Sequence, residues 1–259
     1  MKNLFTLLSI LAISVNLFAQ TNMYIRKTDG SIISMPVTDI DSVFYINTVA
    51  EPVTDFDGNT YQTVQIGTQI WMAENLKTTH YANGDAISLI TVDADWANLG
   101  DNNTDAAYCY YNNNASGEAT TYGALYTWAA AMNGSVTESA QGICPTGWHL
   151  PSATEYTELT DFLGGIDVSG GKMKEVGTTH WSSPNEGATN ESNFSGIGSA
   201  YRRYDNGLYA GIKTIAYFWT STSASDTNAW TLKLSYLSAT TSQMSLNKSL
   251  GATVRCVKN

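Results

Sequence analysis

Alternating apolar and polar residues along the second half of the chain predict β-strands. In "AWTLKLSYL", Trp230, Leu232 and Leu234 alternate with polar residues, which indicates a strand with one buried face and one face in water. The segments "AYFWTST" and "ATVRCVK" are typical of strands as well. Earlier in the chain, Asp57-Gly58 indicates a turn, with strands expected at 61–66 and from residue 70 onward.

Two segments have the spacing of a helix. In "SATEYTELTDFLGG", Ser152 and Glu155 form a capping-box pattern, and Gly164-Gly165 indicates the end of the helix. Its predicted buried face consists of Tyr156, Leu159, Phe162 and Leu163. "GALYTWAAAM" (123–132) predicts a second helix, whereas the polar stretch 93–122 predicts a long excursion of loops.

The first residues are typical of an export signal. Lys2 precedes the apolar run Leu4 to Leu17, which is too short to span a bilayer, so we expect a signal peptide over 1–19. Residues 20–46 predict a small β-strand unit, with a hairpin around "TDG" and another strand near Ile40 to Tyr45. The polar segment 47–54, which contains Pro52, is interpreted as a linker to the main domain, 55–259.

Composition narrows the range of functions. Hydrophobic residues make up 43% of the chain, enough for a core, and charged residues only 14%. The net charge of −10 argues against nucleic acid and anionic membrane surfaces as partners. No second long apolar run follows the leader, so we expect no transmembrane segment in the mature chain.

Several motifs together resemble the Fibrobacter succinogenes major paralogous domain family. They include "DFDGNTYQTVQIGTQIWMAENL", "YGALYTWAAAM", "CPTGWHLPSATEYTEL", "YFWTST" and the terminal "VRCVKN", in family order over about 55–259. The resemblance implies an α+β fold of the C-type lectin-like kind, with two helices, an irregular antiparallel sheet and chain ends that lie close together. It also implies an exported or surface protein without established enzymatic activity, and the 23–46 unit resembles segments found in secreted Bacteroidetes proteins. At Asn193 and "GIGSA" the sequence departs from the family pattern.

The cysteine and histidine beside the capped helix suggest either a reactive site or a covalent link. An exported chain keeps few thiols reduced, and Cys144 precedes a proline, so we expect a disulfide between Cys144 and Cys256. Cys109 is then a buried free thiol. His149 is interpreted as a packing residue, the histidines lack zinc spacing, and no catalytic residue is assigned.

The loop around residue 190 offers oxygen ligands for calcium. Candidate ligands are Asn185, Glu186, Asn190 and Glu191, and no cofactor other than calcium is expected. The alternative interpretation, an Asn-rich loop whose side chains bind its own backbone, is favoured. The earlier Asp55-x-Asp57-Gly58 cluster lacks the remaining ligand positions of a calcium loop and is interpreted as a turn.

The segment "AYRRYDNGLY" is the best candidate for an exposed recognition loop. Two adjacent arginines are costly to bury, so we expect the loop to be in water. The candidate ligand-binding residues are Tyr201, Arg202, Arg203, Tyr204 and Asn206. Most tryptophans are instead predicted to be core residues, namely Trp71, Trp128, Trp148, Trp219 and Trp230.

These features favour a secreted or surface-exposed, non-enzymatic binding module. Its expected partner is a glycan or an extracellular protein, bound through loops of the C-terminal half. One alternative is a structural component of a surface appendage or matrix, with 23–46 as its docking element. A polysaccharide hydrolase is a further alternative, although no pair of carboxylates is marked by the sequence.

Overall fold

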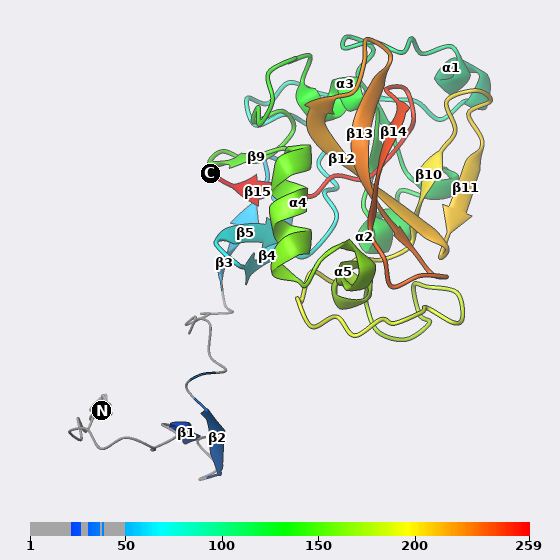
Figure 1. The fold of residues 1–259 in the computed structure, drawn as a ribbon. Coiled ribbons are helices and arrows are strands. Elements are labelled where there is room, and N and C mark those ends of the chain that lie inside the picture. Colours follow the sequence, from blue (N-terminus) through cyan, green and yellow to red (C-terminus); the bar gives the residue numbers. More distant parts are fainter. Residues whose placement is uncertain (1–21, 27–30, 37, 39–49) are drawn as a thin grey trace. The chain divides into compact units, whose positions relative to one another are not determined.

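The computed structural model describes residues 22–26, 31–36, 38 and 50–259, which belong to two separate units divided between Tyr45 and Ile46 (Figure 1). In the first unit, β1 (Asn22–Arg26) and β2 (Ile32–Pro36) form the predicted antiparallel hairpin. The predicted signal peptide and the strand near residues 40–45 lie outside the described residues.

The second unit begins with an edge strand where a linker was predicted. Ala50–Thr54 form β3, at the edge of a sheet whose order is β3-β4-β5-β15-β9. Pro52 is compatible with this edge position because a proline cannot donate to a neighbouring strand. The prediction that 50–54 is a linker is therefore wrong.

This first sheet joins the two ends of the domain. After β3, the predicted turn at Asp57-Gly58 leads into β4 (Thr60–Ile66), which pairs with β5 (Gln69–Met72). The last strand, β15 (Val257–Lys258), lies between β5 and β9 (Trp148–His149). Three distant parts of the sequence thus meet in one sheet.

The second sheet has the order β11-β10-β12-β13-β14 and is buried on both faces at its centre. Its strands are β10 (Ser199–Arg202), β11 (Tyr209–Ile212), β12 (Ile215–Ser223), β13 (Asn228–Ser235) and β14 (Ser242–Asn247). Leu232 and Leu234 pack into one apolar cluster, while Trp219 and Ala229 pack into another. The prediction of one wet face for β13 is wrong, because both sides of this sheet are covered by other parts of the domain.

The helix predicted from the capping box is present as α4 (Ala153–Phe162). The Ser152 hydroxyl accepts from the Glu155 amide, and the Glu155 carboxylate accepts from the Ser152 amide. Figure 1 shows α4 between the two sheets, and Tyr156 and Leu159 pack with residues of both. Phe162, predicted on this face, is instead exposed.

Other parts of the chain form shorter elements than the pattern predicts. Only α3 (Trp128–Met132) of the predicted helix 123–132 is helical, because Leu125–Tyr126 form β8 and the Thr127 side chain caps α3. The helix α5 (Ile166–Met173) was not predicted.

The predicted loops at 93–122 contain short elements, namely α1 (Asp93–Ala97), β7 (Ala107–Cys109), η2 (Tyr111–Asn113) and α2 (Glu118–Tyr122). With β6 (Ser88–Leu89), β7 and β8 form a third sheet of the domain. The described residues are therefore α+β, with short helices and several sheets that include parallel pairs.

The predicted disulfide is confirmed: Cys144 and Cys256 are bonded, with Cα atoms 5.9 Å apart and a sequence separation of 112 residues. Cys109 is a buried free thiol, also as predicted. Beside the disulfide, His149 Nε2 lies 2.7 Å from Glu155 Oε1, and this hydrogen bond raises the pKa of His149. The cysteine–histidine segment therefore links β9, the start of α4 and the last strand.

Four of the five tryptophans predicted as core residues are buried, namely Trp71, Trp128, Trp148 and Trp219. Trp230 is only half-buried, so this part of the prediction is wrong. It lies on the same strand as Leu232, two residues nearer to the start of β13.

Removal of the disulfide should lower stability strongly, because the bond closes a loop of more than a hundred residues in the unfolded chain. For the double variant Cys144→Ala/Cys256→Ala we expect a loss of about 2–5 kcal/mol in the free energy of unfolding. Urea denaturation with and without dithiothreitol measures this. Reduction should destabilise the wild type and leave the double variant unchanged; a double variant as stable as the oxidised wild type would contradict the assignment.

Candidate functional site

The hairpin of β10 and β11 presents residues 203–208 at one side of the domain, close to α1 (Figure 1). The Arg203 amide donates to Leu208 O at 2.9 Å, and the Gly207 amide donates to Arg203 O at 3.1 Å, which closes the turn. Gly207 has a φ of 69°, and a Cβ there would lie 2.1 Å from Asp93 O. Glycine is required at this position because the turn packs directly on the backbone at the start of α1.

Arg202 is buried under this turn and fixes it to the neighbouring segment. Its Nε donates to Gly207 O at 2.7 Å, and Nη1 donates to Ile90 O at 2.5 Å. Nη2 donates to the carboxylate of Asp93 at 2.9 Å, while the guanidinium lies 4.6 Å from the centre of the Trp96 ring. One side chain therefore connects the hairpin with the segment that precedes α1.

The prediction that both arginines of this loop are in water is wrong for Arg202, which is 0% exposed. Its burial is compensated by backbone carbonyl oxygens, by the Asp93 carboxylate and by two aromatic rings. Arg203 does lie on the surface, where it forms a bidentate ion pair with Asp205, with Nη2 2.6 Å from Oδ2. The pair occupies Nε and Nη2 of Arg203, so a ligand that binds this edge of the guanidinium must displace Asp205.

The turn carries exposed apolar side chains beside the segment that Arg202 binds. Tyr204 is 45% exposed and Leu208 51%, and Leu89 and Val92 on the neighbouring segment are 49% and 53% exposed. We call residues 203–208 with Leu89 and Val92 the hairpin-tip surface. Arg203, Tyr204 and Asn206 of this surface were predicted from the sequence. The aliphatic residues Leu89, Val92 and Leu208 were not, and their only signal was an apolar side chain among polar neighbours.

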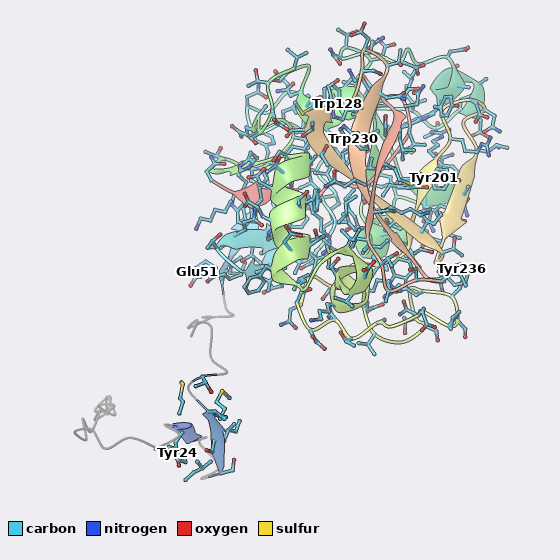
Figure 2. All side chains as sticks on the ribbon, viewed as in Figure 1. Tyr24, Glu51, Trp128, Tyr201, Trp230 and Tyr236 are labelled. Carbon is cyan, nitrogen blue, oxygen red and sulfur yellow. A yellow bond between two sulfur atoms is a disulfide. The ribbon has the colours of Figure 1, made fainter. Side chains whose placement is uncertain are left out.

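Tyr201 does not belong to this surface. Its ring packs against that of Tyr217, with centroids 5.3 Å apart, and it lies next to the main core cluster (Figure 2). Tyr209 is also turned inwards, because its hydroxyl donates to Asn113 Oδ1 at 2.8 Å and its ring lies over the Arg202 guanidinium. Of the five predicted binding residues, the structure therefore places Arg203, Tyr204 and Asn206 on the exposed turn.

The four candidate calcium ligands make other contacts. Asn190 Oδ1 accepts from the Ser195 amide at 2.9 Å, and the Glu191 carboxylate lies 3.5 Å from Lys172 Nζ. Asn185 donates to two backbone carbonyls, those of Glu175 and Gly177, while its buried Oδ1 has no partner among the described residues. Glu186 is exposed. In the part of the chain that is described, no group of three or more His, Cys, Asp and Glu side chains is arranged to hold a metal ion.

A separate cleft of about 270 Å³ is lined by two carboxylates, which their positions in the sequence gave no reason to pair. It is lined by Glu74, Glu175 and His180, among others. His180 Nδ1 lies 2.8 Å from the Glu175 carboxylate, and the Arg255 guanidinium at the same cleft donates to Asn75 and to the carbonyl of Ser195. These contacts occupy part of the polar atoms that line the cleft.

Comparison with known families agrees with the motifs of the sequence. The Fibrobacter succinogenes major domain matches residues 64–258, which include the second sheet, the disulfide and the hairpin-tip surface.

The chain belongs to the Fibrobacter succinogenes major domain family. No curated protein and no solved structure matches it. Among the described residues, no helix has the length and apolar character needed to cross a membrane.

Proposed function

We propose that this chain is an exported, non-enzymatic binding module that recognises a glycan or an extracellular protein through its hairpin-tip surface. The observation that carries the proposal is the support given by Arg202, which fixes the exposed turn to the segment carrying Leu89 and Val92. Exposed apolar and aromatic side chains on a rigid support favour binding, because little conformational entropy is lost when a partner is bound.

Export is supported by the disulfide, since such bonds persist in oxidising compartments. We further propose that the fold is C-type lectin-like. Support comes from the sheet that contains both ends of the domain, from α4 packed between sheets, and from the long irregular connections. The net charge of −10 makes nucleic acid and anionic membrane surfaces unfavourable partners.

The chemistry of the cysteines supports a function without covalent catalysis. Cys144 and Cys256 are bonded to each other in the disulfide, so neither has a free thiol. Burial raises the pKa of the Cys109 thiol to about 11. A thiol with such a pKa is protonated at neutral pH and is a poor nucleophile. The hydrolase alternative has one feature in its favour, the pair Glu74 and Glu175 at one cleft, but Glu175 is already bound by His180.

Truncation of the exposed turn should weaken binding. We expect Tyr204→Ala and Leu208→Ser each to reduce affinity about tenfold or more, because central aromatic and aliphatic contacts dominate interfaces. Glycan arrays and pull-downs from extracellular fractions identify the ligand, and calorimetry then compares the variants. Leu237→Ser is the matched control, because Leu237 is 61% exposed on a different loop. The proposal would be contradicted if neither the arrays nor the pull-downs detect a ligand, or if both variants bind with unchanged affinity.

A role in surface assembly is the second candidate, and the hairpin of β1 and β2 favours it. Tyr24 and Ile32 are 65% and 61% exposed in this two-stranded unit. Isolated two-stranded hairpins are marginally stable, so such apolar residues favour pairing with another chain.

Deletion of residues 22–45 tests the assembly role without altering the second unit. If the hairpin docks the protein, the shortened chain with its leader intact should be released from the cell surface into the medium, as measured by immunoblotting of both fractions. Retention equal to that of the full chain would rule out the docking role.

A further inference from the structure

A second cleft, distinct from the hairpin-tip surface, lies where α3 ends. It has a volume of about 370 Å³ and is lined by residues 81–83, 132, 133, 135, 141, 142 and 146. Every side chain that lines it is uncharged, in a protein whose net charge is −10. We call it the amide cleft, because amides and hydroxyls dominate its lining.

The wall of the amide cleft is held rigidly by α3 and the disulfide. Asn133 ends α3 with a left-handed φ of 51°, and the Ile143 amide donates to Ala131 O at 3.0 Å. A Cβ on Gly142 would lie 2.1 Å from that same carbonyl oxygen, so the two segments are in close contact. Cys144 follows directly and is bonded to Cys256. The cleft is therefore preformed.

Tyr81 supplies an unused hydrogen-bonding group to this cleft. Tyr81 is only 7% exposed as a residue, and its hydroxyl forms no hydrogen bond with a described residue. Burial raises the pKa of Tyr81 to about 12, so the phenol remains a neutral donor at physiological pH. The hydroxyl oxygen is not itself enclosed by the protein, so it can bind a ligand or a water in the cleft.

Neighbouring amides add further donors and acceptors in fixed orientations. Gln141 Nε2 donates to Cys144 O at 3.0 Å, which fixes this amide and leaves its oxygen as an acceptor. The Asn83 amide is oriented by Asp85, to which its Nδ2 donates at 2.7 Å. Met132 also borders the cleft, but it is 0% exposed and belongs to the core behind it.

We propose that the amide cleft binds the end of an uncharged glycan, one or two sugar residues in length. Sugar hydroxyls both donate and accept hydrogen bonds, which matches the Tyr81 phenol and the amides of Asn133 and Gln141. An acidic ligand would lose hydration there without meeting a positive charge, and it would approach a protein whose net charge is −10, which disfavours acidic sugars. The volume lies near the lower end of ligand pockets, about 300–1,000 Å³.

The test uses the full mature chain and neutral gluco-, manno-, galacto- and xylo-oligosaccharides, with the corresponding uronic-acid oligosaccharides as charged counterparts. We expect at least one neutral series to bind and the acidic series not to bind. Tyr81→Phe, which removes one oxygen atom, should weaken the neutral ligand about tenfold. Asn133→Gly, which keeps the left-handed backbone accessible, should weaken it by a similar factor.

Tyr236→Phe is the matched control, because Tyr236 lies outside the cleft, near the end of β13 (Figure 2). Thermal unfolding shows whether each variant is folded. The proposal is overturned if no neutral series binds, if acidic counterparts bind equally well, or if both cleft variants keep full affinity. These outcomes are independent of the hairpin-tip proposal, which is judged on variants of Tyr204 and Leu208.

Discussion

Buried cations bound to backbone carbonyl oxygens are the interaction on which this domain depends. Among the described residues, Lys174, Arg202, Lys248 and Arg255 are each at most 2% exposed. Lys174 Nζ donates to the carbonyls of Glu186, Ser235 and Ser238, all at 2.8 Å. Each buried carbonyl without a donor would cost about 1–3 kcal/mol, so these side chains supply the partners that irregular loops lack.

Aromatic rings offset part of the free-energy cost of burying these charges. Each cation lies within 6 Å of a ring centre: Lys174 over Trp181, Arg202 over Trp96, Lys248 over Trp128 and Arg255 over Phe194. Arg255 also donates to the carbonyl of Phe194 itself. Trp128, Trp181 and Phe194 also belong to the two clusters that cover the faces of the central sheet, and Trp96 belongs to a third cluster. The same rings therefore contribute to apolar packing and to the burial of charge. Long loops can then be rigid without regular hydrogen-bonded ladders, and the hairpin-tip surface lies on such a loop.

The sequence predicted those features that depend on neighbours in the chain. The capping box of Ser152 and Glu155 is local. The disulfide joins distant residues, but it was expected from three cysteines, a predicted export signal and the resemblance to a known family. The failures involve distant partners. Arg202 was expected in water because its acceptors, at Ile90 and Gly207, are brought to it only by folding. Likewise, the pattern around β13 could not show that both sheet faces are covered. Tyr204 was identified for the site, but its aliphatic neighbours and the amide cleft depend on contacts that sequence spacing does not encode.

Hydrogen exchange in an Arg202→Met variant tests this account most directly, because methionine keeps an unbranched apolar stem but removes every donor. The account predicts that the amides of Arg203 and Gly207, which close the turn, exchange much faster than in the wild type. The Met72 amide, bonded to Cys256 O beside the disulfide, should exchange as before. Unchanged protection at Arg203 and Gly207 would show that the turn is stable without its buried cation and would contradict the central claim.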